Sequence, residues 1–170
     1  MESATIIAQS VGLLSFVIGA WCFTQKDDRK FKWIMVALNI NHALHFLLLG
    51  AYTSSACSVL SASRTLTSLK VQSKFVAYLF ILAMVMVSSL WATMWHDWLA
   101  ILGGCIGTYG LFCLTGIKMR ATMLIGSCCW LLNNIILGSI GGTMLELMAI
   151  SVNLTTMIRM RQAVQPQYSN

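Results

Sequence analysis

The sequence predicts an all-α integral membrane protein, and its composition and hydropathy pattern are the reasons. Of the 170 residues, 58% are hydrophobic and only 9% are charged, with a mean hydropathy of +0.76. A soluble domain carries about 25% charged residues, so this composition indicates a lipid environment. Apolar runs also recur at about the 20-residue length that a helix needs to cross the hydrocarbon core.

Six segments are apolar enough to be expected as membrane-spanning helices. The first has no Lys or Arg before its apolar run, unlike a cleaved signal peptide, so we expect it to remain as a helix. The six predicted segments are Ala4 to Thr24, Trp33 to Tyr52, Phe75 to Trp91, Leu99 to Gly116, Ala121 to Leu137 and Thr143 to Ile158.

A seventh segment, Ser54 to Lys70, is rich in Ser and Thr and contains Arg64, so hydropathy alone would reject it. The distribution of basic residues along the chain nevertheless favours it as a membrane-spanning helix. If it spans and the N-terminus is outside, the other basic residues of the connecting loops and helix ends all lie on the cytoplasmic side, as the positive-inside rule requires. These residues are Lys26, Arg29, Lys30, Lys32, Lys70, Lys74, Lys118, Arg120, Arg159 and Arg161. The sequence therefore predicts seven transmembrane helices, N-out and C-in.

The chain also contains an internal repeat. A shift of 88 residues aligns the stretch beginning at Leu44 with the stretch beginning at Leu132, without a gap, and pairs Gly50 with Gly138. This predicts a duplication of three helices around one linker helix, a 3+1+3 arrangement of two parallel triple-helix bundles. The expected parts are a first bundle (1–72), a linker helix with an outer loop (73–97), a second bundle (98–162) and a cytoplasmic tail (163–170).

Two stretches carry a family resemblance: SASRTLTSLK, and MRATMLIGSCCWLLNNIILGSIGGTMLE. Their CCW, Asn, GSIGGT and Glu order resembles that of the YgjV-type family of bacterial inner-membrane proteins, which implies a location in the bacterial inner membrane. The 3+1+3 plan is similar to that of the SWEET, semi-SWEET and PQ-loop transporters. In that comparison Asn153 corresponds to a pocket asparagine, although its repeat mate is Thr65 and no predicted span contains proline.

Several polar residues inside the predicted spans are candidates for substrate binding, because an unpaired polar side chain in lipid costs several kcal/mol. Arg64 lies near the midplane, and its guanidinium suits a carboxylate or a phosphate. A structural bond to helix-end carbonyls or to Glu146, or a side chain extended toward the interface, are the alternatives. Further candidates come from the matching helices of the two bundles, and interhelical bonding is the alternative for each. They are Asn39, His42, Trp130 and Asn134.

Glu146 and His45 are expected near the outer ends of their helices, where they are candidates for gating or proton coupling. Glu146 could instead stabilise the N-terminus of its helix.

Other classes of function find no support in the sequence. The six cysteines have no metal-binding spacing, so no metal or cofactor is expected. No nucleophile and base are recognisable, which argues against an enzyme with catalytic residues. The basic residues are scattered, which argues against nucleic acid as a partner.

The expected function is transport of a small polar solute by alternating access between the bundles. The solute is expected to be anionic if Arg64 contacts it. The alternative is a non-transporting scaffold, receptor or regulatory partner. The expected partners are the solute and the lipid bilayer, and a homo-oligomer is compatible with the sequence.

Overall fold

The computed structural model describes residues 2–25 and 28–164. These residues form seven helices and no strand, which confirms the predicted all-α class. The helices are α1 (Glu2–Thr24), α2 (Asp28–Leu48), α3 (Tyr52–Thr67), α4 (Lys74–Ser89), α5 (Asp97–Cys113), α6 (Gly116–Ile136) and α7 (Ile140–Val164). Lys26 and residues 165–170 of the predicted tail lie outside the described residues.

The polar segment predicted from Ser54 to Lys70 is helical as far as Thr67 and belongs to α3, which begins at Tyr52. Four of its hydroxyl groups donate to carbonyls one turn earlier in the same helix. Ser58 Oγ donates to Ser54 O at 2.9 Å, and Thr65 Oγ1 donates to Ser61 O at 2.7 Å. Because these hydroxyls are satisfied within the helix, a Ser- and Thr-rich sequence is compatible with a helix in an apolar environment.

Most of the described helices are either too short or too polar to be recognised as membrane spans by length and hydropathy alone. Within the described residues, only α1 contains an 18-residue stretch apolar enough to cross a membrane by composition, Thr5–Cys22, with a mean hydropathy of 1.7. Helices α4 and α5 are apolar but have 16 and 17 residues. Helix α2 begins at Asp28, before the predicted Trp33, because helical bonding continues into the basic residues.

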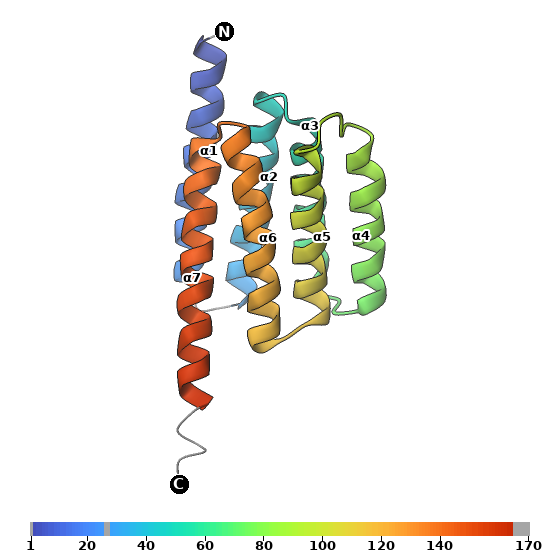
Figure 1. Cartoon of the computed structure of the whole chain (residues 1–170), viewed down its shortest axis with the longest axis vertical. Helices are drawn as coiled ribbons and strands as arrows, with labels where there is room; N and C mark the ends of the chain where they lie inside the picture. The colour runs from blue at the N-terminus through green and yellow to red at the C-terminus, as the bar shows by residue number, and fades with distance from the viewer. Residues whose placement is uncertain (1, 26–27, 165–170) are drawn as a thin grey trace.

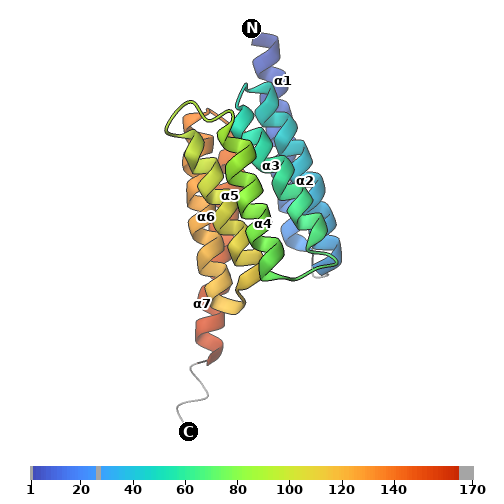
Figure 2. The ribbon, with the colours of Figure 1, turned by 90° about the vertical axis from the view of Figure 1, so that its right-hand side faces the viewer.

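The helices pack mainly with their neighbours in the chain (Figures 1 and 2). Helix α2 packs between α1 and α3, and α6 packs between α5 and α7. We call α1–α3 the first series and α5–α7 the second series. The two series meet along two seams, one between α1 and α7 and the other between α3 and α5, and α4 packs on both α3 and α5. The result is a closed ring of helices with an interior between α2 and α6.

The helix bounds agree with the 88-residue register of the repeat. Adding 88 to the bounds of α2, 28–48, gives 116–136, which are the bounds of α6. Adding 88 to the first residue of α3 gives 140, the first residue of α7. Gly50 and Gly138, which are repeat mates, both have positive φ, 74° and 66°, where they end α2 and α6.

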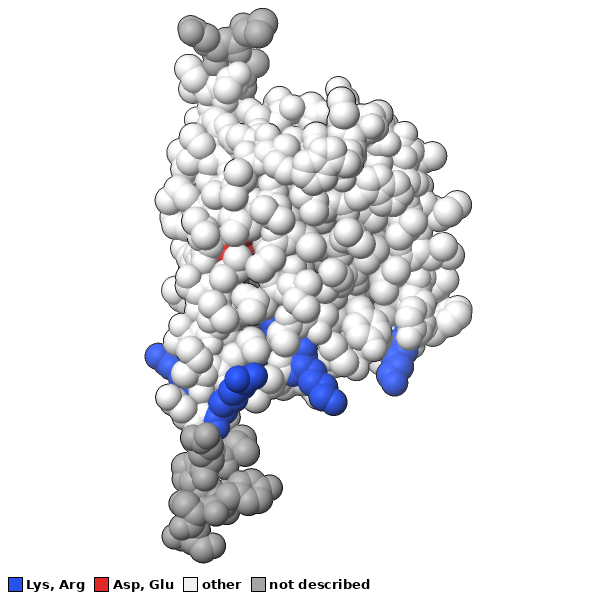
Figure 3. All heavy atoms as spheres, viewed as in Figure 1, with Lys and Arg blue, Asp and Glu red and all other residues white. Residues whose placement is uncertain are grey.

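The distribution of side chains is the reverse of that in a soluble protein. Large apolar residues on most helices are exposed, such as Ile6 at 65%, Phe75 at 70% and Leu82 at 59%. In contrast, the buried set contains many polar residues, among them His45 and Asn134 at 0%. An apolar exterior around a polar interior is the arrangement that a lipid environment imposes. Basic side chains gather at the end of the molecule from which α7 leads to the C-terminus (Figure 3), here called the basic end.

Glycines allow helices to approach closely, both between the two series and within the second series. At the α1–α7 seam, a Cβ on Gly141 would overlap the carbonyl carbon and oxygen of Gly12. Between α5 and α6, a Cβ on Gly103 would lie 3.0 Å from Gly126 O. Backbones in such contact gain packing energy that larger residues would prevent, as in other membrane helix pairs.

We expect Gly141→Ala to destabilise the protein, because the added methyl group meets backbone that can move only if α1 and α7 separate. Overpacking of this kind costs about 1–3 kcal/mol. Thermal unfolding in detergent should show a midpoint lowered by several degrees. Ile140→Ala, on the exposed side of the same turn at 57% exposure, is the matched control and should change the midpoint little. Equal midpoints for the two variants would contradict the close crossing.

Candidate functional site

A column of aromatic rings fills the interior between α2 and α6. The His42 and Phe46 rings stack with centroids 4.8 Å apart, and Phe46 stacks on Trp130 at 5.8 Å. Trp130 reaches α5, where the missing Cβ of Gly103 leaves room for the indole. Two predicted binding residues, His42 and Trp130, are therefore brought together through Phe46, which is completely buried. In the 88-residue register His42 and Trp130 are repeat mates.

His45 connects the two series at the end of the ring opposite the basic end. Its Nδ1 lies 2.7 Å from Ala8 O of α1, and its Nε2 lies 2.6 Å from Ser139 Oγ in the turn before α7. Because the Ala8 carbonyl can only accept, Nδ1 donates there, and in the neutral ring Nε2 accepts from Ser139. Ser139 Oγ in turn accepts from Gly142 N at 3.1 Å.

Asn133, the repeat mate of His45, makes the corresponding connection in the opposite direction. Its Nδ2 donates to Ser54 Oγ, near the start of α3, at 3.0 Å. A side chain near the end of α2 thus reaches the beginning of α7, and its mate near the end of α6 reaches the beginning of α3. Both bonds are buried and both join the first series to the second.

The turn between α6 and α7 is also bonded to α1. Gln9 Nε2 donates to Gly138 O at 2.7 Å, and Gln9 Oε1 accepts from Ile140 N at 3.2 Å. One amide side chain therefore satisfies a carbonyl and an N–H group of this turn. Together with the His45 bond, this fixes the turn to the first series.

Three polar side chains near the aromatic column contain buried atoms without a hydrogen-bond partner in the structure. They are Asn134, with both its Oδ1 and its Nδ2, His42 with its Nε2, and Thr53 with its Oγ1. Asn134 is completely buried and lies against Gly142, where a Cβ would clash with its Oδ1. An unpaired amide is costly in an apolar interior, so such a group requires an explanation.

Arg64 bonds across the α3–α5 seam. Its Nη1 donates to Thr108 Oγ1 at 3.0 Å and lies 3.4 Å from Gly104 O. Gly107 makes the space, since a Cβ there would lie 3.3 Å from Nη1. The buried Nε has no partner. Among the described residues no carboxylate pairs with Arg64, so the predicted alternative bond to Glu146 is not formed. The carbonyl that Arg64 meets, Gly104 O, lies in the middle of α5 and not, as predicted, at a helix end.

The remaining predicted residues form no hydrogen bond with the residues of the aromatic column in the described structure. Asn39 donates to Met35 O of its own helix at 2.8 Å. Asn153 is buried and accepts from Arg120 Nη1 at 3.2 Å. Glu146 lies beside the Ser127 side chain of α6. No ion pair joins Glu146 to His45, whose two ring nitrogens are occupied as described above.

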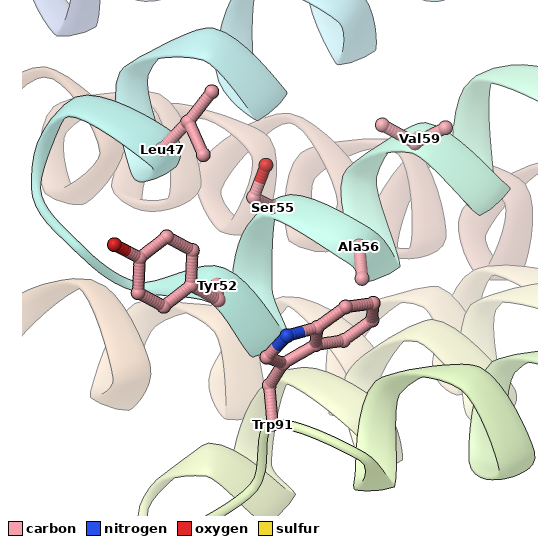
Figure 4. Close-up of a pocket in the computed structure, with 6 residues that line it drawn as sticks. All are labelled: Leu47, Tyr52, Ser55, Ala56, Val59 and Trp91. Carbon is pink, nitrogen blue, oxygen red and sulfur yellow. The ribbon is translucent and has the colours of Figure 1, made fainter.

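Two hollows lie on the flanks of the ring. One, of about 210 Å³, is enclosed by α2, α3 and the indole of Trp91, which stands against Tyr52 and Ala56 (Figure 4). The other, of about 460 Å³, lies at the basic end between α2 and the end of α3. Neither hollow contains the residues of the aromatic column, which is closely packed in this structure.

A ring of helices with an apolar exterior and a hydrogen-bonded polar interior defines a multi-pass membrane protein. The chain belongs to the YgjV family of bacterial inner membrane proteins, whose family model matches residues 6–164. It is similar to the inner membrane protein YgjV of Escherichia coli strain K12, with 36% identity over 156 residues that cover 90% of this chain and 84% of the relative. No solved structure matches. The predicted family and the predicted inner-membrane location are confirmed.

Sequence reasoning missed the partners of the site residues, chiefly Ser139, Ser54, Gln9 and Thr108. The repeat contained a signal for two of them. His45 and Asn133 are repeat mates at the ends of α2 and α6, so each could have been expected to bond the beginning of the opposite series. Nothing in the local sequence distinguishes Gln9 or Thr108 from other polar residues in apolar helices.

We expect His45 and Ser139 to be energetically coupled. Ser139→Ala leaves a buried ring nitrogen unpaired, so the single variant should be more destabilising in the presence of His45 than in a His45→Phe background. A double-mutant cycle, with unfolding free energies from SDS titration in mixed micelles, should give a coupling of about 0.5–3 kcal/mol. Ser139→Ala combined with Asn41→Leu is the control. Asn41 bonds only within the first series, so additive effects are expected there. Additivity in the His45 cycle would contradict the connection.

Proposed function

We propose that the protein is a transporter, not an enzyme, and that it moves a small polar solute across the inner membrane by alternating access between the first and second series. The observation that carries this proposal is Asn134. Its amide is completely buried and lies against Gly142 of α7, and neither its oxygen nor its nitrogen has a partner in the structure. A solute with hydroxyl, amide or carboxylate groups would satisfy both atoms. Trp130, one turn earlier on α6, would place that solute beside the Phe46 ring of the first series.

The neighbours of Asn134 suit such a solute. Trp130 lies one turn earlier on α6 and offers an aromatic face, and His42 has a free Nε2 at the matching depth of α2. The column fills the space in this structure, so binding requires the rings to separate.

The connections between the two series suggest which end opens. Gln9, His45 and Asn133 all bond from one series to the other at the end of the ring away from the basic residues. At the basic end, Lys32 bonds Ser68 and Arg120 bonds Asn153, each within its own series. Opening of the end away from the basic residues therefore requires that the bonds of Gln9, His45 and Asn133 be broken. In this scheme His45 acts as a gate at that end. In this scheme Arg64 positions α5 against α3.

The 3+1+3 arrangement of two parallel bundles and the N-out, C-in orientation belong to this proposal. The matching bounds of α2 and α6 and the packing of α1 on α7 and α3 on α5 support two related units. The concentration of Lys and Arg at one end supports its assignment to the cytoplasm (Figure 3).

A second candidate is a non-transporting membrane component, such as a scaffold or regulatory partner. The close packing of the aromatic column favours it, because Phe46 leaves no open path between α2 and α6. In this case the unpaired amide of Asn134 has no ligand, and solute movement is absent.

The orientation predicts a labelling pattern for single cysteines. In a background with all six native cysteines replaced by Ser, Trp95→Cys should react with a membrane-impermeant maleimide in intact spheroplasts. Lys118→Cys should react only after permeabilisation, because it lies at the basic end. Both residues are exposed, so access to the reagent is limited by the membrane alone. The opposite pattern would reverse the assigned orientation.

We expect Asn134→Ala to abolish most solute movement in proteoliposomes. The probes are labelled glucose, glycerol, lactate, inorganic phosphate and glutamine, measured as initial uptake rates with wild-type protein. For a transported probe, loss of one or two hydrogen bonds of about 1 kcal/mol each should reduce the rate about tenfold.

Asn41→Ala is the matched control for this experiment. Like Asn134→Ala it removes an amide, here a half-buried one. Because Asn41 bonds Val11 and Ser15 of α1, the uptake rate of this variant should stay within about twofold of wild type. Thermal unfolding checks that both variants are folded. Unchanged uptake in Asn134→Ala would contradict the proposed site, and no uptake of any probe by the wild type would favour the non-transporting alternative.

A further inference from the structure

The larger hollow, at the basic end, is built from two kinds of residue. Arg29 and Lys70 supply positive charge, and an aromatic and aliphatic wall surrounds them. The wall and floor are formed by Trp33, Leu66, Thr67, Leu69 and Val71. The hollow has a volume of about 460 Å³ and opens on the outside of the ring, between the beginning of α2 and the end of α3.

The two cations of this groove have no partner among the side chains that the structure describes. No hydrogen bond or ion pair with a described side chain engages Arg29 or Lys70. A third cation, Lys32, lies one turn from Arg29 and donates to Ser68 O at 2.9 Å. That bond covers a carbonyl at the C-terminal end of α3, where the partial negative charge of the helix would otherwise repel an anion. Among the described side chains around the groove, the charge is therefore positive.

The apolar wall faces outward. Trp33 is 51% exposed, Leu66 is 43% exposed and Val71 is 41% exposed, so the groove that contains the two cations also presents an apolar surface to its surroundings. A freely soluble anion would match the charges and leave this apolar surface unused. A molecule with a phosphate at one end and acyl chains at the other would match both parts.

The cations and the tryptophan of this groove are not repeated in the second series. The residues 88 positions after Arg29, Trp33 and Lys70 are Ile117, Ala121 and Ile158. The corresponding place on the second series thus lacks both cations and the aromatic side chain. The repeat of the fold therefore does not account for the combination of two cations and a tryptophan around this groove.

From this geometry we infer that the groove binds the headgroup of an anionic phospholipid, with the phosphate between Arg29 and Lys70 and the acyl chains along the exposed surface of α2 and α3. Trp33 lies beside the glycerol region, where aromatic side chains of membrane proteins are enriched. Basic pockets between helices at the cytoplasmic side are a known setting for such lipids. The site is independent of the proposed transport, because it lies outside the ring and shares no residue with the aromatic column.

Native mass spectrometry of the detergent-solubilised full chain tests this inference. The probes are dioleoyl-phosphatidylglycerol, which is anionic, and dioleoyl-phosphatidylcholine, which is zwitterionic. The test variant is Arg29→Gln combined with Lys70→Gln. The charge-matched control is Lys118→Gln combined with Arg159→Gln, because both of these residues are exposed near the basic end of the second series. Thermal unfolding without added lipid checks that both variants are folded.

We expect the wild type to bind phosphatidylglycerol more tightly than phosphatidylcholine. The apparent Kd for phosphatidylglycerol should rise about tenfold or more in the test variant and less than about twofold in the control. An unchanged Kd in the test variant, or the same rise in both variants, would overturn the site in favour of general surface charge. Complete displacement of the lipid by millimolar inorganic phosphate would show that the groove recognises a free anion instead.

Discussion

An apolar surface that faces lipid is the constraint on which the rest of this structure depends. No water is available inside the hydrocarbon, so each polar side chain must bond its own helix, bond another helix or remain unpaired at a cost. Ser58 and Thr65 of α3 follow the first route, and His45 follows the second. Asn134 follows the third. The ring of helices closes because the bonds of the second kind run between elements far apart in the sequence.

The features that depend on local sequence could be predicted. Hydropathy and charge distinguished seven helices, including α3, in which Thr65 and several other hydroxyls bond carbonyls of the same helix. The repeat register also followed from the sequence, since Gly50 and Gly138 end α2 and α6, both with positive φ. The inward placement of Asn134 and His42 followed from the cost of polar groups in lipid.

The bonding partners could not be predicted, because they depend on how each helix is rotated and shifted against its neighbours. Ser139 is 94 residues from His45, and Thr108 is 44 residues from Arg64. A rotation of one helix by a single residue position, about 100°, would replace either partner. Asn153 shows the same effect, since it is buried as expected but bonded to Arg120. Helix bounds were missed where helical bonding continues into polar flanks, as at Asp28.

The two seams of the ring are chemically different although the repeat relates them. At the α1–α7 seam, Gly12 and Gly141 bring backbone against backbone. Their repeat mates at the α3–α5 seam are Ala100 and Thr53, both buried, and the Thr53 hydroxyl is unpaired. The second seam also contains the Arg64 bonds and is covered by α4. Separation of α1 from α7 would forfeit the backbone contact between Gly12 and Gly141. Separation of α3 from α5 would let water reach Thr53 Oγ1 and Arg64 Nε, the two buried polar atoms of this seam that lack partners. Any relative motion of the two series is therefore less costly at the α3–α5 seam, and the α1–α7 seam is the natural hinge.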